Sequence, residues 1–559
     1  MTKSLDEYIE NELIEEINSL KKQKKYGLVW EDKLEKVAKD CEGMLPVVKE
    51  VPEKTIHEDD NSKPTNIIIE GDNYHALSVL NYTHAEKIDV IYIDPPYNTG
   101  NKDFVYNDSF VDKEDSFRHS KWLSFMRKRL ILAYELLKTN GVIFISIDDN
   151  EYANLNLMCQ DIFGEDNIET IIWHKVADDS GRLKITHRVR REHEYILVCY
   201  KNIKDTFFKK YLSDRNYKNT YTNPDNDPRG PYKQGIISTT EAKSNKNGKN
   251  YYSVTTPSGK QYSRQWRVSK DEFEKLDSDG RIYYGKKGNS VPSLKVFINE
   301  KKETTPTTLF LDLGTAKTAG KELRNILNKE LKERFPIKPS ELIYRIVQIS
   351  SNKNDTILDF FAGSGTTGQA VLELNQNDNG SRSFILCTNN EANGKVEAGR
   401  DGVAQKVLYP RIKTVITGIR GDGTKYSDGI PANVRYFKTD FVEKGDSTDE
   451  TREKIVARAT DIIRIKEGTF DTVLDNQSLK LYSNGNVLTA IIFDPFNMAN
   501  LWEDIEKNNP NKHKTNLYIF SYSSDVSAFT DEIPSDTKIN WTSKPIPDGI
   551  LKVYKKLFK

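Results

Sequence analysis

The segment IDVIYIDPPYNTG, residues 88–100, holds the residues whose types and spacing best fit a reactive site. An apolar run precedes Asp94, so in an α/β protein this carboxylate lies at the carboxyl edge of the sheet, where such folds bind ligands. Pro95 and Pro96 fix φ and remove two backbone N–H donors, which leaves the Asp94 carboxylate and backbone carbonyls as acceptors beside the Tyr97 ring. This set suits a planar amine, because an exocyclic NH2 group offers two donors. The alternative is an ordinary turn after a strand, since these residue types are common in turns.

A second candidate site is the segment DTILDFFAGSGTTGQAVLELN, residues 355–375. A strand, a glycine turn and a helix follow one another, so backbone N–H groups at the helix start face a ligand that approaches over Gly363 and Gly365. The spacing also satisfies GxGxxG, and Glu391 follows about 20 residues later, as a dinucleotide site requires. Asp359, directly before the glycines, favours S-adenosylmethionine instead, because a carboxylate receives the ammonium of an amino acid but repels a pyrophosphate.

Both sites depend on strands and helices that alternate along the chain. Short apolar runs predict buried parallel strands, and the stretches between them have helical periodicity. The predicted strands are Asn66–Glu70, Asp89–Asp94, Val142–Ile147, Glu169–His174, Glu194–Tyr200, Thr356–Phe360 and Ser383–Thr388, and the predicted helices are Phe117–Lys138, Lys338–Ser350 and Thr366–Asn375. This order predicts an α/β sheet that is split by a long insertion.

The insertion differs from the rest of the chain in charge and aromatic content. Residues 181–300 contain 25 Lys and Arg against 13 Asp and Glu, although the whole chain has a formal net charge of zero. They also contain 16 aromatic residues among turn-forming residues. This composition suits a surface that neutralises phosphates and stacks on bases. The alternative is a solvated, loop-rich insertion. The zero net charge therefore excludes only a uniformly basic nucleic-acid binder.

The two ends of the chain give coarser expectations. We expect residues 1–60 to form a helical arm, whose apolar stripe needs a partner. The stripe consists of Leu5, Ile9, Leu13, Ile17 and Leu20. Residues 443–559 are expected to form a small α+β domain with a strand pair around Asn484-Gly485. No apolar run approaches the about 18 residues of a membrane span, and the acidic start has no signal-peptide core. The four cysteines are scattered along the chain. We therefore expect a cytoplasmic protein that does not bind a membrane.

The two motifs and their order resemble the DNA amino-methyltransferases of the β group. The signatures of this family are an FxGxG cofactor loop, here Phe361–Gly365, and a [DNS]PP[YFW] catalytic loop, here Asp94–Tyr97. The catalytic loop comes first, and the basic, aromatic insertion lies between the two. The resemblance is closer still to the modification (Mod) subunits of Type III restriction-modification systems. It covers nearly the whole chain, including DPPYNTGNKDFVYNDSF, HSKWLSFMRKRL, NGVIFISIDDNE and FPIKPSELI.

This resemblance implies a fold and a domain organisation. The fold is an α/β, circularly permuted S-adenosylmethionine-dependent methyltransferase (Rossmann-like) core with an inserted target recognition domain and a small α+β C-terminal domain. The expected domains are the N-terminal helical arm at 1–60, the first part of the core at 61–203, the target recognition domain at 204–335, the second part of the core at 336–442, and the C-terminal domain at 443–559.

The resemblance also implies roles for the residues of the catalytic loop. Asp94 and the Pro95 carbonyl would hold the N6 amino group of a flipped-out adenine, Pro96 belongs to the same loop, and Tyr97 would stack on the base. Such enzymes extrude their target because it is unreachable inside a stacked duplex. Methylation of cytosine N4 stays open, since its amine needs the same acceptors. A further alternative is a non-catalytic subunit that recognises sites for a nuclease partner.

For the cofactor, S-adenosylmethionine, the implied residues come from several segments. The methionine side would be lined by Asp359, Phe361, Gly363 and Gly365, while Lys338 and Ser340 match the motif that precedes the cofactor loop. Asp72 would approach the cofactor adenine, with a helix N-cap as the alternative. Glu391 arrives late for the acidic residue that binds the ribose hydroxyls, which puts its role in doubt.

The implied partners are double-stranded DNA and a second copy in a homodimer, with a restriction (Res) helicase-nuclease subunit as a candidate partner. The chain itself has no helicase or nuclease motif, so any cleavage requires a second protein. No metal site is expected. Asp148, Asp149 and Glu151 cluster after a predicted strand, and we interpret them as a solvated helix start in preference to a metal site.

Overall fold

The computed structural model describes residues 28–57, 63–176 (except 102 and 108), 189–212, 221–328 (except 299, 301, 302 and 312), 337–390 and 402–558 (except 446). The chain divides into two compact units, one made of Met1–Lys209 with Thr307–Lys559 and the other of Lys210–Pro306. The predicted stripe from Leu5 to Leu20 and the predicted site residue Glu391 lie outside the described residues.

The first unit is built on a ten-stranded sheet with the order β1-β19-β2-β18-β17-β3-β6-β8-β7-β16. The six strands from β19 to β6 are parallel to one another, whereas β1 and β8 run antiparallel to the strands beside them. In sheet order the strands are Met44–Glu50, Asn433–Glu443, Thr65–Glu70, Ser383–Thr388, Thr356–Asp359, Ile88–Ile93, Leu137–Ile147, His193–Tyr200, Ile168–His174 and Leu309–Phe310. The seven predicted strands are thus confirmed within a few residues.

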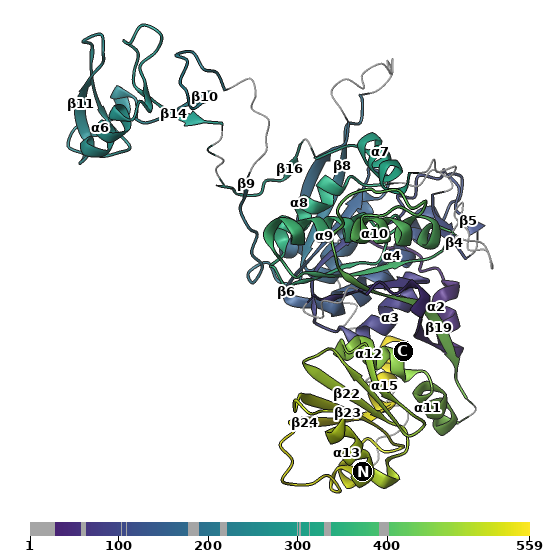
Figure 1. The fold of residues 1–559 in the computed structure, drawn as a ribbon. Coiled ribbons are helices and arrows are strands. Elements are labelled where there is room, and N and C mark those ends of the chain that lie inside the picture. The colour runs from purple at the N-terminus through teal and green to yellow at the C-terminus, as the bar shows by residue number, and fades with distance from the viewer. Residues whose placement is uncertain are drawn as a thin grey trace, which may run out of the picture. The chain divides into compact units, whose positions relative to one another are not determined.

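Helices cover both faces of this sheet, which explains why its strands read as continuous apolar runs. Every side chain of β3 is buried, as expected for a parallel strand between two helical layers. In Figure 1, α8, α9 and α10 lie together on one face, and α3 and α4 lie on the other with α5 packed against α4. These helices are Ser340–Ser350, Thr366–Asp378, Tyr409–Thr417, Asn73–Thr83, Arg118–Leu136 and Tyr152–Phe163. The expected Rossmann-like α/β core is confirmed.

The strand order brings two distant parts of the chain together. Strand β17, which leads into the glycine turn, pairs in parallel with β3, which leads into Asp94, through Ile357–Val90 and Leu358–Ile91. The carboxyl ends of parallel strands meet at one edge of a sheet, so the two motif loops leave the sheet side by side. The core is therefore permuted as expected, with the Asp94 loop first in the chain.

The second unit has its own small core. It contains the three-stranded sheet β10-β14-β13, the hairpin β11-β12, the strand pair β15-β9 and the helix α6. Their bounds are Tyr232–Gly235, Ser293–Phe297, Ile282–Tyr283, Tyr251–Thr255, Gln261–Gln265, Glu303–Thr304, Tyr211–Leu212 and Lys270–Ser278. The core gathers Ile237, Val254, Trp266, Phe273, Ile282 and Tyr284. The basic, aromatic sequence is thus a folded unit, not a string of loops.

This unit is shorter than the insertion expected at 204–335. Strand β16 pairs with β7 of the main sheet, and α7, Ala316–Leu327, buries Leu323 against Val403 and Val407. Both elements therefore belong to the first unit, because their apolar side chains find partners there. Composition alone did not predict that the chain re-enters the first unit before residue 335.

The C-terminal residues form a five-stranded sheet, β20-β21-β22-β23-β24, within the first unit. Its strands are Asp471–Asp475, Leu479–Ser483, Val487–Ile492, Lys514–Phe520 and Trp541–Ile546, and its helices include α11, Thr448–Val456, α12, Ala459–Glu467, α13, Met498–Lys507, and α15, Asp548–Leu557. The predicted strand pair around Asn484-Gly485 is confirmed as β21-β22. Ion pairing of Arg464 with Glu50 at 2.6 Å and burial of Tyr554 tie this part to the Rossmann-like core.

Near the N-terminus, the expectation of a helical arm up to residue 60 is wrong for residues 44–50. This stretch is β1, an edge strand that pairs with β19. Pro46 and the valines that follow it disfavour a helix, and proline is tolerated in an edge strand. Before it, α2 spans Lys36–Gly43, and Trp30 and Lys33 bond to Ser124 of α4. In the part of the chain that the structure describes, no helix is long and apolar enough to cross a membrane.

Candidate active site

The Asp94–Tyr97 loop begins where β3 ends, at the carboxyl edge of the sheet. The Asp94 side chain is 18% exposed, and its Oδ1 lies 2.9 Å from the Nζ of Lys338. This contact is an ion pair without the alignment of a hydrogen bond, so Oδ1 is a buried acceptor with no aligned donor. Burial raises the pKa of Asp94, and the charge of Lys338 opposes that rise. An amine that enters here meets a carboxylate oxygen with capacity to accept.

Tyr97 is fixed by two charged neighbours. The Lys338 ammonium donates to its hydroxyl at 2.6 Å, and the hydroxyl donates to Glu194 Oε2 at 3.0 Å. Lys338 also lies 3.1 Å from Glu194, whose other oxygen accepts from Lys175 at 3.0 Å. Lys338, expected at the cofactor, thus lies against the catalytic loop. Glu194, at the start of β8, was not expected in the site at all.

The loop is also held by hydrogen bonds to α4 and to Glu151, the residue that precedes α5. Trp122 donates its indole N–H to the Pro96 carbonyl at 2.7 Å. Asn98 has a φ of 57° and is fully buried, and its side chain donates to Glu151 at 2.5 Å. Asparagine tolerates this left-handed backbone better than most residues. These bonds fix the direction in which Asp94 and Tyr97 leave the strand.

Glu151 corrects the expectation of a solvated acidic helix start. It is completely buried and also hydrogen bonds to His119 at 2.6 Å and Asn154 at 2.7 Å, whereas Asp148 and Asp149 keep solvent contact. Its donors come from segments that only the fold brings together. Within the described ranges, no group of three or more His, Cys, Asp or Glu side chains could hold a metal ion.

The second loop, after β17, is shaped by Asp359. This carboxylate is buried, and it accepts from the Phe361 N–H at 3.0 Å and from the Thr367 hydroxyl at 2.5 Å. Burial raises the pKa of Asp359 to about 7. Since Thr367 is on α9, the carboxylate closes the glycine turn onto the start of that helix.

The two glycines of this loop have different surroundings. Gly365 has a φ of 79°, and a Cβ there would lie 3.1 Å from a side-chain carbon of Leu408. Gly363 has a φ of 48°, and a Cβ there would meet only the loop's own Phe361 carbonyl, at 3.7 Å. Gly365 is therefore needed for packing and backbone conformation, while Gly363 presents an open backbone face. An open glycine face beside a strand-end carboxylate and a helix start fits S-adenosylmethionine.

A buried arginine network supports the same loop. Arg411 of α10 donates to the hydroxyl of Thr366 at 2.8 Å, to that of Ser364 at 3.2 Å and to the Gln369 carbonyl at 2.7 Å. Gln369 in turn donates to Glu322, which also accepts from the hydroxyl of Ser340 at 2.6 Å. Ser340, expected at the cofactor, is thus buried with its hydroxyl directed at Glu322. Ser340 therefore lies next to the residues that support the glycine loop.

Asp72 follows β2 and serves as a helix cap. Its carboxylate accepts from the Tyr74 N–H at 2.7 Å, so the N-cap alternative is confirmed. The side chain keeps 30% of its exposure and lies 3.3 Å from Arg129, which is buried and ion-paired with Glu35. Asn73 donates to the Phe360 carbonyl at 3.0 Å, which holds this strand end beside the glycine loop.

Several residues of the site were missed from sequence, namely Glu151, Glu194, Arg129 and Arg411. Arg129 and Glu194 have a signal in the sequence, since each is a charged residue next to an apolar run, as in MRKRLILAY and EYILVCY. Charged side chains are almost never fully buried unless they are paired. Such residues mark positions where the fold must supply a partner.

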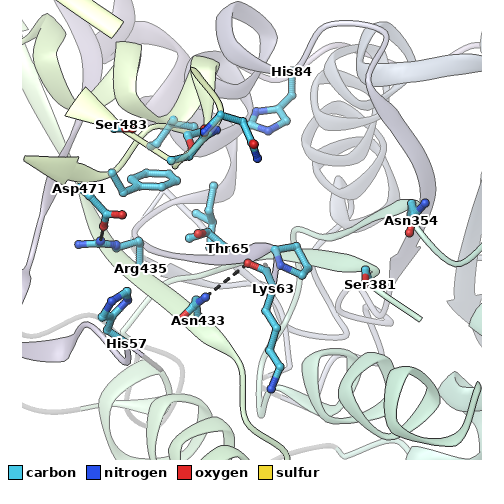
Figure 2. Close-up of a pocket in the computed structure, with 17 residues that line it drawn as sticks. His57, Lys63, Thr65, His84, Asn354, Ser381, Asn433, Arg435, Asp471 and Ser483 are labelled. Carbon is cyan, nitrogen blue, oxygen red and sulfur yellow. Dashed lines mark hydrogen bonds and ion pairs between the residues drawn. The ribbon is translucent and has the colours of Figure 1, made fainter. Parts of the chain in front are cut away.

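A separate cavity of about 390 Å³ lies at the opposite, amino-terminal edge of the sheet (Figure 2). Thr65 and Asn433, the first residues of β2 and β19, line it together with Lys63, Arg435 and Asp471. Lys63 donates to the Pro431 carbonyl at 3.1 Å, and Arg435 pairs with Asp471 at 3.1 Å. Its polar groups thus bond one another, and it is distinct from the edge that carries Asp94 and Asp359.

Comparisons with known proteins agree with this site. The model of the N6_N4_Mtase family, described as DNA methylase, matches residues 88–393, which include both loops. The chain is 34% identical over 395 residues to the Mod subunit of the Type III restriction-modification enzyme StyLTI of Salmonella typhimurium strain LT2, covering 66% of this chain and 58% of that subunit. It is 32% identical to the EcoPI Mod subunit of Escherichia phage P1 (70% and 68% covered) and 28% identical to the EcoP15I Mod subunit of Escherichia coli (68% and 67% covered).

The matched regions thus span between 58% and 68% of the lengths of these relatives. The match extends beyond the two short motifs, since the family model includes the sheet strands from β3 to β18. The chain therefore belongs to the DNA methylase family, and within it to the Mod subunits of Type III restriction-modification systems.

Proposed function

We propose that this chain transfers a methyl group from S-adenosylmethionine to N6 of an adenine flipped out of duplex DNA. The observation that carries the proposal is the pairing of β3 with β17, which puts the Asp94 loop beside the glycine loop. An amine acceptor site and a cofactor site are thereby neighbours at one edge of the sheet. Family membership gives the reaction class, and the chemistry of the two loops gives the roles.

The cofactor would be held by Asp359, Phe361, Gly363 and Gly365 at its amino-acid end and by Asp72 at its adenine. The open face of Gly363 admits the ligand, and the start of α9 provides backbone N–H groups. A direct contact of Glu391 with the ribose remains part of the proposal. When bound, S-adenosylmethionine supplies an electrophilic methyl group on a sulfonium sulfur.

The residues of the catalytic loop would orient the attacking nitrogen. Asp94 and the Pro95 carbonyl each accept one N–H of the amino group, which turns the nitrogen lone pair toward the cofactor loop. Tyr97 stacks on the base, and its hydroxyl, bound to Lys338 and Glu194, fixes the plane of the ring. The nitrogen would form a bond to the methyl group, whose bond to sulfur breaks, and would lose one proton to the Asp94 carboxylate. Most of the rate enhancement would come from orientation and electrostatics.

The second unit, Lys210–Pro306, would choose the target sequence. Its supports are the excess of basic and aromatic residues and its position as a separately folded insertion between the two parts of the core. Exchange of residues 210–306 with the equivalent block of another Mod subunit should exchange the methylated sequence. An unchanged sequence in DNA from cells that express the hybrid contradicts this assignment.

The wider assembly is also proposed. Mod subunits of Type III systems are the relatives, so a Res helicase-nuclease subunit and a second copy of this chain are the expected partners, and the cytoplasm is the expected location. Light scattering that gives a monomer mass at micromolar concentration contradicts the homodimer.

Transfer of labelled methyl groups to unmethylated duplex DNA tests the proposal. The wild type should label the DNA, and Asp94→Ala should reduce the signal to background while S-adenosylmethionine still binds. Equal background signals for both proteins, with correct folding, contradict the enzymatic function and favour the non-catalytic alternative. Label found only on cytosine favours N4 methylation.

A further inference from the structure

Lys338 occupies a position that the reaction, as outlined above, does not yet explain. It precedes α8, far along the chain from the catalytic loop, and its side chain is only 10% exposed. Its ammonium contacts both chemically active side chains of that loop, Asp94 at 2.9 Å and Tyr97 at 2.6 Å. One buried cation thus contacts both the amine acceptor and the stacking ring.

Glu194 holds this cation in place. It lies 3.1 Å from the ammonium and is itself supported by Lys175 at 3.0 Å, so the charges alternate along Asp94, Lys338, Glu194 and Lys175. Burial alone would lower the pKa of Lys338, but Asp94 and Glu194 outweigh it and hold that pKa above its ordinary value. Burial would likewise raise the pKa of Glu194, but the two lysines hold it below its ordinary value. Lys338 therefore stays charged while it is buried.

The charge matters because Asp94 must accept hydrogen bonds. A carboxylic acid that is protonated donates through one oxygen and accepts poorly from an amine. Burial favours that protonated form, and the cation opposes it. Besides Lys338, the groups that face Asp94 are Glu194 on β8, Tyr92 and Tyr97 on its own segment, and Asp359 at the end of β17. Lys338 is the one cation that contacts Asp94 among the described residues.

We propose that Lys338, held by Glu194, is a positioning residue that keeps Asp94 ionised as the amine acceptor and fixes the Tyr97 ring, and that it does not serve primarily as a cofactor ligand. The inference rests on the proposed methyl transfer. It assigns opposite electrostatic effects to two neighbouring residues, because Lys338 favours the ionised form of Asp94 whereas the like charge of Glu194 disfavours it.

The test compares single-turnover methyl transfer as a function of pH in the wild type, Lys338→Met, Lys338→Arg and Glu194→Gln. In Lys338→Met, the acid limb of the profile should move to higher pH by one unit or more, so the rate at pH values on that limb falls about tenfold or more and recovers as the pH rises. In Glu194→Gln the acid limb should move to lower pH. Lys338→Arg keeps the charge and should keep the acid limb of the wild type. Asp359 is held by Phe361 and Thr367, which none of these substitutions removes, so it should not produce opposite shifts.

Two further readouts separate the possible roles. Calorimetry should give the same affinity for S-adenosylmethionine in Lys338→Met as in the wild type, within about twofold. A duplex with 2-aminopurine at the target position, its sequence read from DNA that the wild type methylates, should show a smaller fluorescence increase with Lys338→Met, since a less well oriented Tyr97 stabilises a smaller population of the flipped-out base. The matched control is Lys480→Met, which breaks an ion pair with Asp475 (3.0 Å) in the C-terminal sheet and should leave every readout unchanged.

Three results overturn the inference. A uniform loss of rate at all pH values in Lys338→Met indicates a merely structural ion pair, a loss of cofactor affinity indicates a cofactor ligand, and shifts of the acid limb in the same direction for Lys338→Met and Glu194→Gln contradict the electrostatic account. Should the wild type itself transfer no methyl group, the proposed function fails, and that outcome is distinct from all three.

Discussion

Asp94 and Asp359 are the same residue type at the ends of neighbouring strands, but the structure uses them in different ways. Asp94 is paired with the cation Lys338 and keeps a buried oxygen without an aligned donor. Asp359 is held by two neutral donors of its own loop, the Phe361 N–H and the Thr367 hydroxyl. Burial raises the pKa of both carboxyls. The contacts of Asp94 thus leave one carboxylate oxygen without an aligned donor, whereas the contacts of Asp359 close its own loop onto α9.

Removal of the Asp94 carboxylate should have the largest effect on catalysis. Asp94→Ala should lower the rate of methyl transfer by about 100- to 1,000-fold, the usual effect of deleting a group that orients and stabilises the reacting atoms. The cofactor affinity should change little, because Asp94 is not in the glycine loop. Single-turnover kinetics and calorimetry measure the two quantities. A large loss of cofactor affinity in this variant would contradict the division between the loops.

The Asp359 carboxyl should instead affect stability, with a definite pH dependence. Its pKa rises from 3.8 to about 7 on folding, so its stabilising contribution is complete below pH 3.8 and is lost as the pH rises through about 7. Asp359→Asn removes this loss, so above pH 7 the variant should be more stable than the wild type by up to about 4 kcal/mol. Urea unfolding at acidic and alkaline pH measures this. An equal pH dependence in both proteins would show that the carboxyl does not titrate as described.

Substitutions of the two glycines in the cofactor loop should affect stability and cofactor affinity differently. Gly365→Ala should lower the free energy of unfolding by about 1–3 kcal/mol, because its φ is positive and its Cβ would crowd Leu408. Gly363→Ala should cost about 1 kcal/mol, since its surroundings are open. It should nevertheless weaken S-adenosylmethionine binding about tenfold or more, because the methyl group occupies the face over which the ligand approaches.

Urea unfolding and calorimetry on both glycine variants provide the measurement, and each variant is the control for the other. Equal losses of cofactor affinity at matched stability would mean that Gly363 has no special role in admitting the ligand.

Much of the core was predictable because its signals are local. Continuous apolar runs predicted the strands, and the sequences around Asp94 and Gly363 predicted the two loops. Their adjacency came only with the structure, since strand pairing across a long insertion has no local signal. Residues 44–50 were predicted as helix because the charged periodicity before them was extended too far, although Pro46 marked the change.

The supports of the site were not predictable for a different reason. Glu151 was expected to be solvated, yet the fold surrounds it with Asn98, His119 and Asn154. Lys338 was assigned from its motif to the cofactor, and the structure shows that its ammonium contacts Asp94 and Glu194, which the motif does not predict. Whether a charged side chain can be buried depends on partners that are distant in sequence. Only the three-dimensional structure shows which residues are those partners.

The central claim is that the neighbouring loops methylate the exocyclic amine of adenine. Mass spectrometry of nucleosides from duplex DNA treated with the wild type and S-adenosylmethionine tests it most directly. The account predicts N6-methyladenine with the wild type and its absence with Asp94→Ala. N4-methylcytosine as the product, or no methylated nucleoside with the folded wild type, would contradict it.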